Sequence, residues 1–300
     1  MKHLLGIEDL DATAIEKLID DATRLKAMRG VGQERPLDGQ TWALIFTKSS
    51  TRTRVSFEVG LHELGANAMF LNANDIQLGR GEPIKDTARV LGRMVHGAII
   101  RTFDQQDVVD FANFGGIPTI NALTDEEHPC QIIADLLTIR ERLGGWNGKK
   151  IVFLGDGDCN MGRSWAWAAK RLGFELVIAA PEEFQPADAF MSRLGEAPVE
   201  VTDDPVAAAT GADVLYTDTW VSMGKEDEAA DRLATLAPFQ LNESLVALAK
   251  PNAIVQHCLP AYRDKEITES LLEERDDEIF QQAENRLHAQ KAILCALAKG

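Results

Sequence analysis

Six short polar segments carry residue types that could do chemistry. The first is residues 49–54 (SSTRTR), which follow an apolar run and open a helical one. Hydroxyls and free backbone N–H groups at a helix start bind anions, and a guanidinium adds bidentate contacts to phosphate. The alternative is a Ser/Thr helix cap with two solvated arginines. The placement of STRTR between a strand and a helix favours the phosphate site.

Arg101 and the segment His128-Pro129-Cys130-Gln131 are the next candidates. Arg101 ends an apolar run, from which its guanidinium could reach an acyl oxygen or a phosphate; alone it would be a surface residue. Pro129 restricts the residue before it, which should keep His128 extended with its imidazole facing outward. A histidine and an amide three residues apart could hold the two ends of a planar carbamoyl group, and the alternative is a helix-entry turn.

Residues 155–160 (GDGDCN) lie between a strand and a helix. A dinucleotide loop GxGxxG would need a third glycine where Asn160 stands, so an NAD site is disfavoured. A tight turn that presents Asn160 to a ligand is the better interpretation.

The segment 218–224 begins with Asp218 at a strand end and continues through Trp220, Ser222 and Met223. A carboxylate here suits a ligand that carries an ammonium group, whereas the alternative is a polar loop capped by Asp218. Trp220 and Met223 are expected to be exposed, and exposed apolar side chains favour a binding site.

The sixth segment is residues 257–260 (HCLP). A cysteine at the end of an apolar strand is usually an inert buried thiol. The adjacent Pro260 interrupts the strand ladder at its carboxyl end, which favours a functional role for Cys258.

The elements that position these segments alternate between strand and helix. Strands are predicted at residues 41–47, 67–71, 98–102, 119–121, 151–155, 175–180, 213–218 and 253–258, and helices at 11–26, 51–64, 130–143, 164–172 and 281–298. This alternation predicts an α/β fold of two domains, each a parallel sheet flanked by helices. The expected domains are residues 1–134 and 135–281, with the C-terminal helix, 282–300, returning to the first. All six segments then lie at or near carboxyl ends of strands, where such sheets bind ligands.

Composition excludes several function classes. The formal net charge of −16 disfavours nucleic acid and anionic membrane surfaces as partners. Four widely spaced cysteines without a CxxC pair argue against a zinc site or a disulfide framework, so no metal is expected. Without a signal peptide or an apolar run of ~18 residues, the expected location is cytoplasmic.

Taken together, the segments resemble the aspartate/ornithine carbamoyltransferase family from about residue 10 to 296. STRTR, the HPxQ segment and residues 284–292 (ENRLHAQKA) carry the likeness in the family's order and spacing. Asp218 with the SMG residues 222–224, and HCLP at 257–260, resemble the ornithine branch. That branch transfers the carbamoyl group of carbamoyl phosphate to the δ-amine of L-ornithine, giving L-citrulline and phosphate in arginine biosynthesis, and it needs no cofactor.

The resemblance also implies roles for individual residues. The expected carbamoyl phosphate-binding residues are Ser50, Thr51, Arg52, Thr53, Gln77, Arg101, His128, Gln131, Cys258, Leu259 and Arg286. The expected ornithine-binding residues are Asn160, Asp218, Ser222 and Met223. The expected catalytic residues are Arg101, His128, Asp218 and Cys258. Gln77 would come from a neighbouring subunit, so the resemblance implies a homotrimer with its active site at the subunit interface.

Two rival interpretations remain open at this point. A carbamoyltransferase for another amine, such as putrescine or N-acetylornithine, would share most of these residues. The second rival is an α/β protein that binds a metabolite without catalysis. Such a protein would not need the carbamoyl phosphate-binding residues and the ornithine-binding residues together. Cys159, where many relatives carry asparagine, and Tyr262, where histidine or lysine-rich sequences are common, depart from the family pattern.

Overall fold

The computed structural model describes residues 1–32, 34–72, 81–221 and 226–298. The chain divides into two compact units. The first unit comprises Met1–Leu137 with Glu284–Gly300, and the second comprises Thr138–Ala283. None of the helices in the described ranges is long and apolar enough to span a membrane.

The first unit holds, within its described residues, a four-stranded parallel sheet in the order β2-β1-β3-β4. Its strands are β1 (Thr41–Phe46), β2 (Asn67–Asn72), β3 (Gly97–Arg101) and β4 (Thr119–Leu123). Its helices are α1 (Ala12–Ala27), α2 (Thr51–Glu63), α3 (Ile84–Leu91) and α4 (Gln105–Gly115), with the first part of α5 (Pro129–Leu143) and the last part of α12 (Asp276–Ala298).

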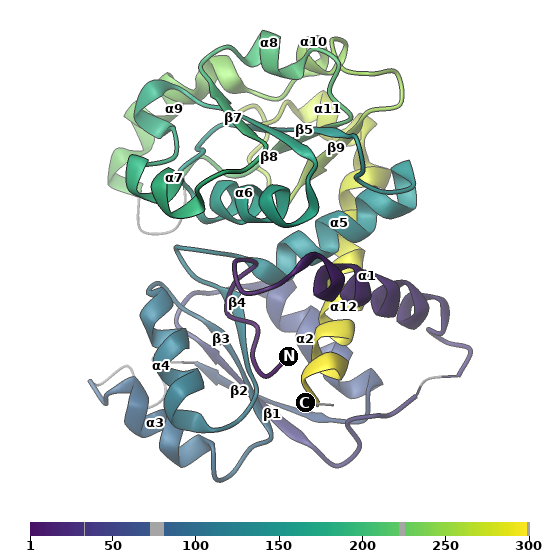
Figure 1. Cartoon of the computed structure of the whole chain (residues 1–300), viewed down its shortest axis with the longest axis vertical. Coiled ribbons are helices and arrows are strands. Elements are labelled where there is room, and N and C mark those ends of the chain that lie inside the picture. The colour runs from purple at the N-terminus through teal and green to yellow at the C-terminus, as the bar shows by residue number, and fades with distance from the viewer. Residues whose placement is uncertain (33, 73–80, 222–225, 299–300) are drawn as a thin grey trace. The chain divides into compact units, whose positions relative to one another are not determined.

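Side chains alternate between the two faces of this sheet, as strand geometry requires. Ala43 and Ile45 of β1 pack with Val108 and Phe111 of α4 in one apolar cluster. In Figure 1, α3 and α4 cover this face, and α2 and α12 lie on the other. An added Cβ on Gly60 of α2 would lie 3.3 Å from the Lys291 side chain of α12. The C-terminal helix therefore packs on the first unit, as predicted.

The second unit holds, in its described part, a five-stranded parallel sheet in the order β7-β6-β5-β8-β9. Its strands are β5 (Lys150–Leu154), β6 (Glu175–Ala179), β7 (Val199–Thr202), β8 (Val214–Thr217) and β9 (Ile254–His257). Its helices are α6 (Asn160–Leu172), α7 (Asp188–Leu194), α8 (Pro205–Ala209), α9 (Ala229–Leu236), α10 (Glu243–Val246) and α11 (Glu269–Glu274), with short 3₁₀ turns η3 (Glu182–Phe184), η4 (Glu226–Glu228) and η5 (Ala237–Phe239).

The two faces of the second sheet are covered by different helices. Val152 and Leu154 face a cluster that includes Leu245 of α10 and Leu271 of α11. On the opposite face, Trp165 of α6 packs edge-to-face on Tyr216 of β8 at 5.4 Å. Both faces are thus buried, which explains why the strands of parallel sheets are near-continuous apolar runs.

The predicted fold class is confirmed, and each of the eight predicted strands is present within two residues of its predicted ends. The prediction missed β7, a short edge strand whose residues are exposed or only half-buried and therefore carry little apolar signal. It also started two helices late. The helix predicted from 164 begins at Asn160, and the one predicted from 281 begins at Asp276.

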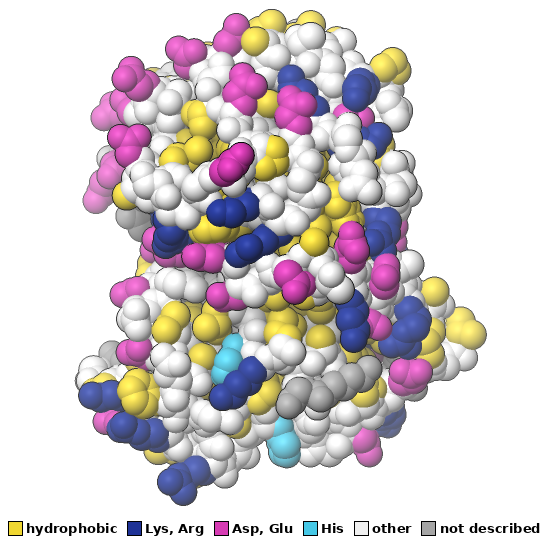
Figure 2. All heavy atoms as spheres, in the orientation of Figure 1, with side chains coloured by type: hydrophobic (Ala, Val, Ile, Leu, Met, Phe, Trp, Pro, Cys, Tyr) yellow, Lys and Arg dark blue, Asp and Glu magenta, His cyan; other side chains and the backbone are white. Residues whose placement is uncertain are grey.

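Charged side chains of both signs are spread over the face of the molecule shown in Figure 2. Acidic residues outnumber basic ones, 47 to 31, over the whole chain. Any cluster of cations is therefore a local feature of a chain that is acidic as a whole.

Candidate active site

The predicted anion site begins at the start of α2. Ser50 is its N-cap, and its hydroxyl accepts a hydrogen bond from the Thr53 backbone N–H at 3.3 Å. The same hydroxyl donates to Thr53 Oγ1 at 2.9 Å. Thr53 is fully buried, Ser50 is half-buried and Thr51 is exposed. The cap leaves other N–H groups of the first helical turn available to an anion.

Arg286 of α12 joins this helix start through a hydrogen bond from its Nη2 to Thr53 Oγ1 at 2.7 Å. The two arginines of STRTR differ. Arg54 pairs with Glu58 at 2.8 Å and stacks on Phe70, whereas Arg52 forms no ion pair within the described residues. Arg52 is therefore the arginine of this motif whose charge is not neutralised by a neighbouring carboxylate.

Arg101 lies at the carboxyl end of β3, where the register with β4 shifts between Ile100 and Arg101. Such an irregularity redirects the side chain that follows it. The Arg101 carbonyl accepts from the Thr47 N–H at 2.9 Å, and the residue is 9% exposed. Its position at a strand end is as predicted.

His128 precedes α5, and its carbonyl accepts from the Gln131 N–H at 3.1 Å. Its imidazole is buried, so the expectation that Pro129 turns it outward is wrong. Burial lowers the pKa of His128 well below its usual value, and the nearby charges of Arg286 and Arg101 lower it further. His128 is thus a neutral imidazole in the field of two guanidinium groups.

Gln131 lies one turn into α5 and is 1% exposed. Its amide nitrogen donates to Asp135 Oδ1 at 2.7 Å. Its amide oxygen has no hydrogen-bond partner among the described residues. A buried carbonyl-type oxygen without a partner is an acceptor for a ligand N–H group, because leaving it unpaired is costly.

The turn before His128 is held by residues that the sequence analysis did not single out. Thr124 Oγ1 donates to Gln105 Oε1 at 2.6 Å, and the Asn121 amide donates to the Leu5 carbonyl at 2.8 Å. The buried carboxylate of Glu127 accepts from the Ile7 N–H at 2.8 Å. A polar run after a strand gives no pattern from which these long-range partners could be predicted.

In the second unit, the loop after β5 leads into α6 as predicted. An added Cβ on Gly155 (φ +121°) would lie 2.8 Å from the Trp220 indole nitrogen, so only glycine fits there. Cys159 is the N-cap of α6, and its sulfur accepts from the Gly162 N–H at 3.4 Å. Asn160 is therefore the first helical residue, and it is half-buried.

Asp218 and Cys258 meet at the carboxyl ends of β8 and β9. The Cys258 thiol donates to Asp218 Oδ1 at 2.7 Å, and the Thr219 N–H donates to the same oxygen at 2.6 Å. Burial raises the pKa of Asp218, and the negative charge of Glu266 adds to that rise. Cys258 and His257 act in the opposite direction and lower it. The pair combines a carboxylate that has a raised affinity for a proton with a protonated thiol.

The backbone that follows Cys258 is unusual. Leu259 has φ +55°, in the left-handed region that a bulky branched residue rarely adopts. Its N–H donates to His257 Nδ1 at 2.9 Å. Non-glycine residues held in this region are concentrated at functional sites.

Trp220 is 2% exposed, so the expectation of an exposed tryptophan is wrong. Its carbonyl accepts from Arg232 Nε at 2.7 Å, and Arg232 also pairs with Asp156. The indole packs over Gly155, which is why it leaves the surface. Ser222, Met223 and Gln77 lie outside the described residues.

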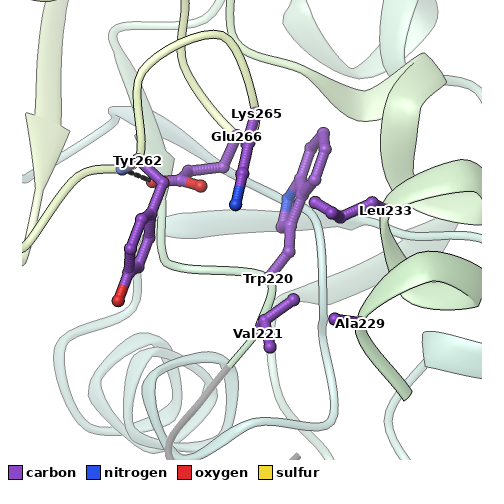
Figure 3. Close-up of a pocket in the computed structure, with 7 residues that line it drawn as sticks. All are labelled: Trp220, Val221, Ala229, Leu233, Tyr262, Lys265 and Glu266. Atoms are coloured by element: carbon purple, nitrogen blue, oxygen red, sulfur yellow. Dashed lines mark hydrogen bonds between the residues drawn. The ribbon is translucent and has the colours of Figure 1, made fainter. Parts of the chain in front are cut away.

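A pocket of about 160 Å³ adjoins this part of the second unit. It is lined by Trp220, Val221, Ala229, Leu233, Tyr262, Lys265 and Glu266. In Figure 3 the Trp220 indole lies between Leu233 and the Lys265 ammonium, and the Tyr262 ring extends away from it. No cluster of three or more His, Cys, Asp or Glu side chains suited to a metal ion occurs in the described ranges.

Two family models together match most of the chain. The aspartate/ornithine carbamoyltransferase carbamoyl-P binding domain matches residues 2–141, and the Asp/Orn binding domain of the same family matches residues 147–297.

Individual relatives are similar over their full length. The chain is 60% identical to an ornithine carbamoyltransferase of Akkermansia muciniphila, over 99% of this chain and 98% of that one. Among solved structures, ornithine carbamoyltransferase from Pyrococcus furiosus superposes with a TM-score of 0.94 at 43% identity, covering 100% of this chain and 97% of that one. The anabolic ornithine carbamoyltransferase of Campylobacter jejuni gives a TM-score of 0.94 at 40% identity, covering 100% and 99%. The chain belongs to the aspartate/ornithine carbamoyltransferase family.

Proposed function

We propose that this protein transfers the carbamoyl group of carbamoyl phosphate to the δ-amine of L-ornithine, giving L-citrulline and phosphate. The observation that carries this proposal is the full-length 60% identity to an ornithine carbamoyltransferase. The reaction is then a step of arginine biosynthesis, which agrees with the anabolic label of the Campylobacter jejuni relative.

Carbamoyl phosphate is assigned to the first domain, residues 1–134 with 282–300. The phosphate would bind Ser50, Thr51, Arg52 and Thr53, because a helix start and an unpaired guanidinium suit it. The remaining contacts from this domain are proposed for Gln77, Arg101, His128, Gln131 and Arg286, and Cys258 and Leu259 of the second domain are proposed to contact the carbamoyl group as well. The unsatisfied Gln131 oxygen supports a role in binding the carbamoyl NH₂ group.

Ornithine is assigned to the second domain, residues 135–281. Asn160, Asp218, Ser222 and Met223 would bind its amino-acid end. The position of Asn160 at the start of α6 and of Asp218 at the end of β8 supports this assignment, since both occupy carboxyl-end positions of a parallel sheet.

Catalysis would rest on stabilising the charge that develops on the carbonyl oxygen. When the neutral δ-amine attacks the carbonyl carbon, negative charge builds on that oxygen in a tetrahedral intermediate. Arg101, Arg52, Thr53 and neutral His128 are the proposed donors, and one such donor is typically worth ~3 kcal/mol. Because burial holds His128 in the neutral form, it can donate a hydrogen bond without adding a buried charge.

The amine must also lose a proton, and Asp218 with Cys258 is the pair proposed to receive or orient it. The raised pKa of Asp218 supports this role, since a base is most effective when its pKa is close to the working pH. The Cys258 thiol is a hydrogen-bond donor to Asp218, so it is not poised as a thiolate nucleophile. Direct transfer between two aligned substrates needs no thiol intermediate.

The proposed assembly is a cytoplasmic homotrimer in which a neighbouring subunit supplies Gln77 to the active site. Size-exclusion chromatography with light scattering would measure the mass of the assembly. A monomeric mass in an active preparation would contradict this part of the proposal.

The test of function is citrulline formation from carbamoyl phosphate by the purified protein. Ornithine is compared with putrescine, N-acetylornithine and aspartate at equal concentration. Rapid turnover with ornithine alone is expected. Turnover with another amine would retain the carbamoyl phosphate assignment and overturn that of the second pocket, and absence of turnover with all four would overturn the activity itself.

A further inference from the structure

Glu266 is a buried carboxylate beside the pocket in Figure 3, and the proposed reaction gives it no role. It is 1% exposed. Its Oε1 accepts from the Tyr262 backbone N–H and lies 3.2 Å from His257 Nε2. Its Oε2 has no hydrogen-bond partner in the described ranges. In Figure 3 this second oxygen points toward the side where the Lys265 ammonium lies.

The contacts of the His257 ring fix its tautomer. Nδ1 receives the Leu259 N–H at 2.9 Å, and a backbone N–H can only donate. Nδ1 must therefore be unprotonated, so the proton of the imidazole lies on Nε2 and is donated to Glu266. The other tautomer, or an imidazolium, would place two N–H groups against each other.

This arrangement determines the backbone at the proposed active site. Leu259 is held at φ +55° by a ring nitrogen that can accept only while Glu266 takes the proton on the opposite side. Cys258 lies between His257 and Leu259 in the chain, and its thiol donates a hydrogen bond to Asp218 at 2.7 Å. A change at Glu266 would therefore reach Cys258 and Leu259 through His257.

We propose that Glu266 is a positioning residue that fixes His257 as its Nε2–H tautomer and thereby sets the conformation of Cys258 and Leu259. This inference rests on the proposed function only in that these two residues would bind the carbamoyl group. The geometric part can be tested without any substrate.

The first test is nitrogen-15 NMR of the histidine side chains in the full-length protein without substrate, at pH 7.5. The chain has six histidines, and the His257 signals are assigned from their loss in His257→Gln. A neutral ring protonated on Nε2 is expected. A ring protonated on Nδ1, or on both nitrogens, would overturn the proposal even if the protein makes citrulline.

The second test is a double-mutant cycle on kcat/KM for carbamoyl phosphate with Glu266→Met, His257→Gln and the double variant. Glu266→Met is expected to reduce kcat/KM by roughly 10- to 100-fold, since a displacement of about 1 Å has this effect. The double variant should lose no more than His257→Gln alone, because Glu266 acts through His257. Additive losses, or full activity in Glu266→Met, would contradict the inference.

Two control variants separate positioning from general damage. Glu266→Gln keeps an acceptor for His257 Nε2–H, because the Tyr262 N–H requires the amide oxygen to take the Oε1 position. The kcat/KM of this variant should therefore stay close to that of the unchanged protein. Glu269→Met replaces an exposed glutamate on α11 and should have no effect. A loss in Glu266→Gln as large as in Glu266→Met would overturn the hydrogen-bond argument.

Discussion

The two units shift the pKa of a titratable group in opposite directions. In the first, His128 faces Arg101 and Arg286, and both burial and these cations lower its pKa. In the second, burial raises the Asp218 pKa and the negative charge of Glu266 adds a small further rise, whereas Cys258, His257 and Thr219 oppose it. Each environment therefore disfavours the charged form of its titratable group.

This difference supports the different chemical task that is proposed for each unit. A neutral imidazole among guanidinium groups is suited to bind a dianionic phosphate and to stabilise an oxyanion. A carboxylate with a raised pKa beside an acidic neighbour is suited to bind an ammonium group or to take up a proton. The division agrees with the two family domains, one described as carbamoyl-P binding and the other as Asp/Orn binding.

Removing a cation from the first unit should have the largest effect. Arg101→Met is expected to lower kcat by roughly 100- to 1,000-fold, the typical cost of losing one oxyanion donor. Steady-state citrulline formation measures it. Arg54→Met is the matched control, because Arg54 pairs with Glu58 and stacks on Phe70. An equal loss in both variants would show that the effect is not specific to the site.

Removing the Asp218 carboxylate from the second unit should have the second-largest effect on kcat. Asp218→Asn keeps the shape of the side chain and removes its proton affinity, so kcat should fall by about 100-fold or more. Asp231→Asn, at an exposed position on α9, should have no comparable effect. Unchanged turnover in Asp218→Asn would remove the contrast between the two units as an account of catalysis.

Cys258 tests whether the second unit acts through its carboxylate or through the thiol. Cys258→Ala should lower kcat by roughly 10-fold without abolishing it, since Asp218 loses one hydrogen bond but no nucleophile is lost. Cys258→Ser, which still offers a donor to Asp218, should retain more activity. A complete loss in Cys258→Ala, or a carbamoyl-cysteine in a mass spectrum, would overturn direct transfer.

The sequence predicted the parts of both units that depend on local pattern. Apolar runs predicted the strands, Ser50 begins the helix that follows β1, and Asp218 directly follows β8, as expected. Burial of Trp220 and of the His128 imidazole was not predicted, because each depends on a partner distant in the chain. The Trp220 indole packs on Gly155, and His128 lies in the field of Arg286.

Glu266 illustrates the same limit. Nothing in the sequence KEIT marks a glutamate as the partner of a histidine nine residues earlier. The pair is defined only when β9 and the segment before α11 fold together, with the Tyr262 N–H directed at the same carboxylate. The positions of the candidate segments in the fold followed from the sequence, whereas the groups that orient them did not.

His128 should also give the first unit a pH-dependent stability. Because its folded pKa is lowered, the unfolded chain takes up a proton that the folded state excludes below about pH 6.5. The stability that His128 contributes is therefore fully present above that pH and is lost progressively as the pH falls from there to the folded pKa. Urea unfolding at pH 8 and pH 5.5 should show a smaller loss of stability in His128→Asn than in the unchanged protein. His62→Asn, at an exposed position, is the control.

The smallest expected effect concerns Cys159, the N-cap of α6 in the second unit. Burial, together with the charges of Asp156 and Asp218, raises the pKa of Cys159 well above its usual value, so its sulfur stays protonated. A neutral thiol is a weak acceptor for the Gly162 N–H, which it meets at 3.4 Å.

Asparagine is among the strongest N-cap residues, and its amide N–H groups could also donate to the carboxylates of Asp156 and Asp218. Cys159→Asn should therefore raise the free energy of unfolding by about 0.5 to 1 kcal/mol in urea titrations. A lower stability would mean that the acidic surroundings of the second unit have no room for a longer cap. In that case the cysteine would be a packing requirement of this chain and not a weak cap that asparagine could improve.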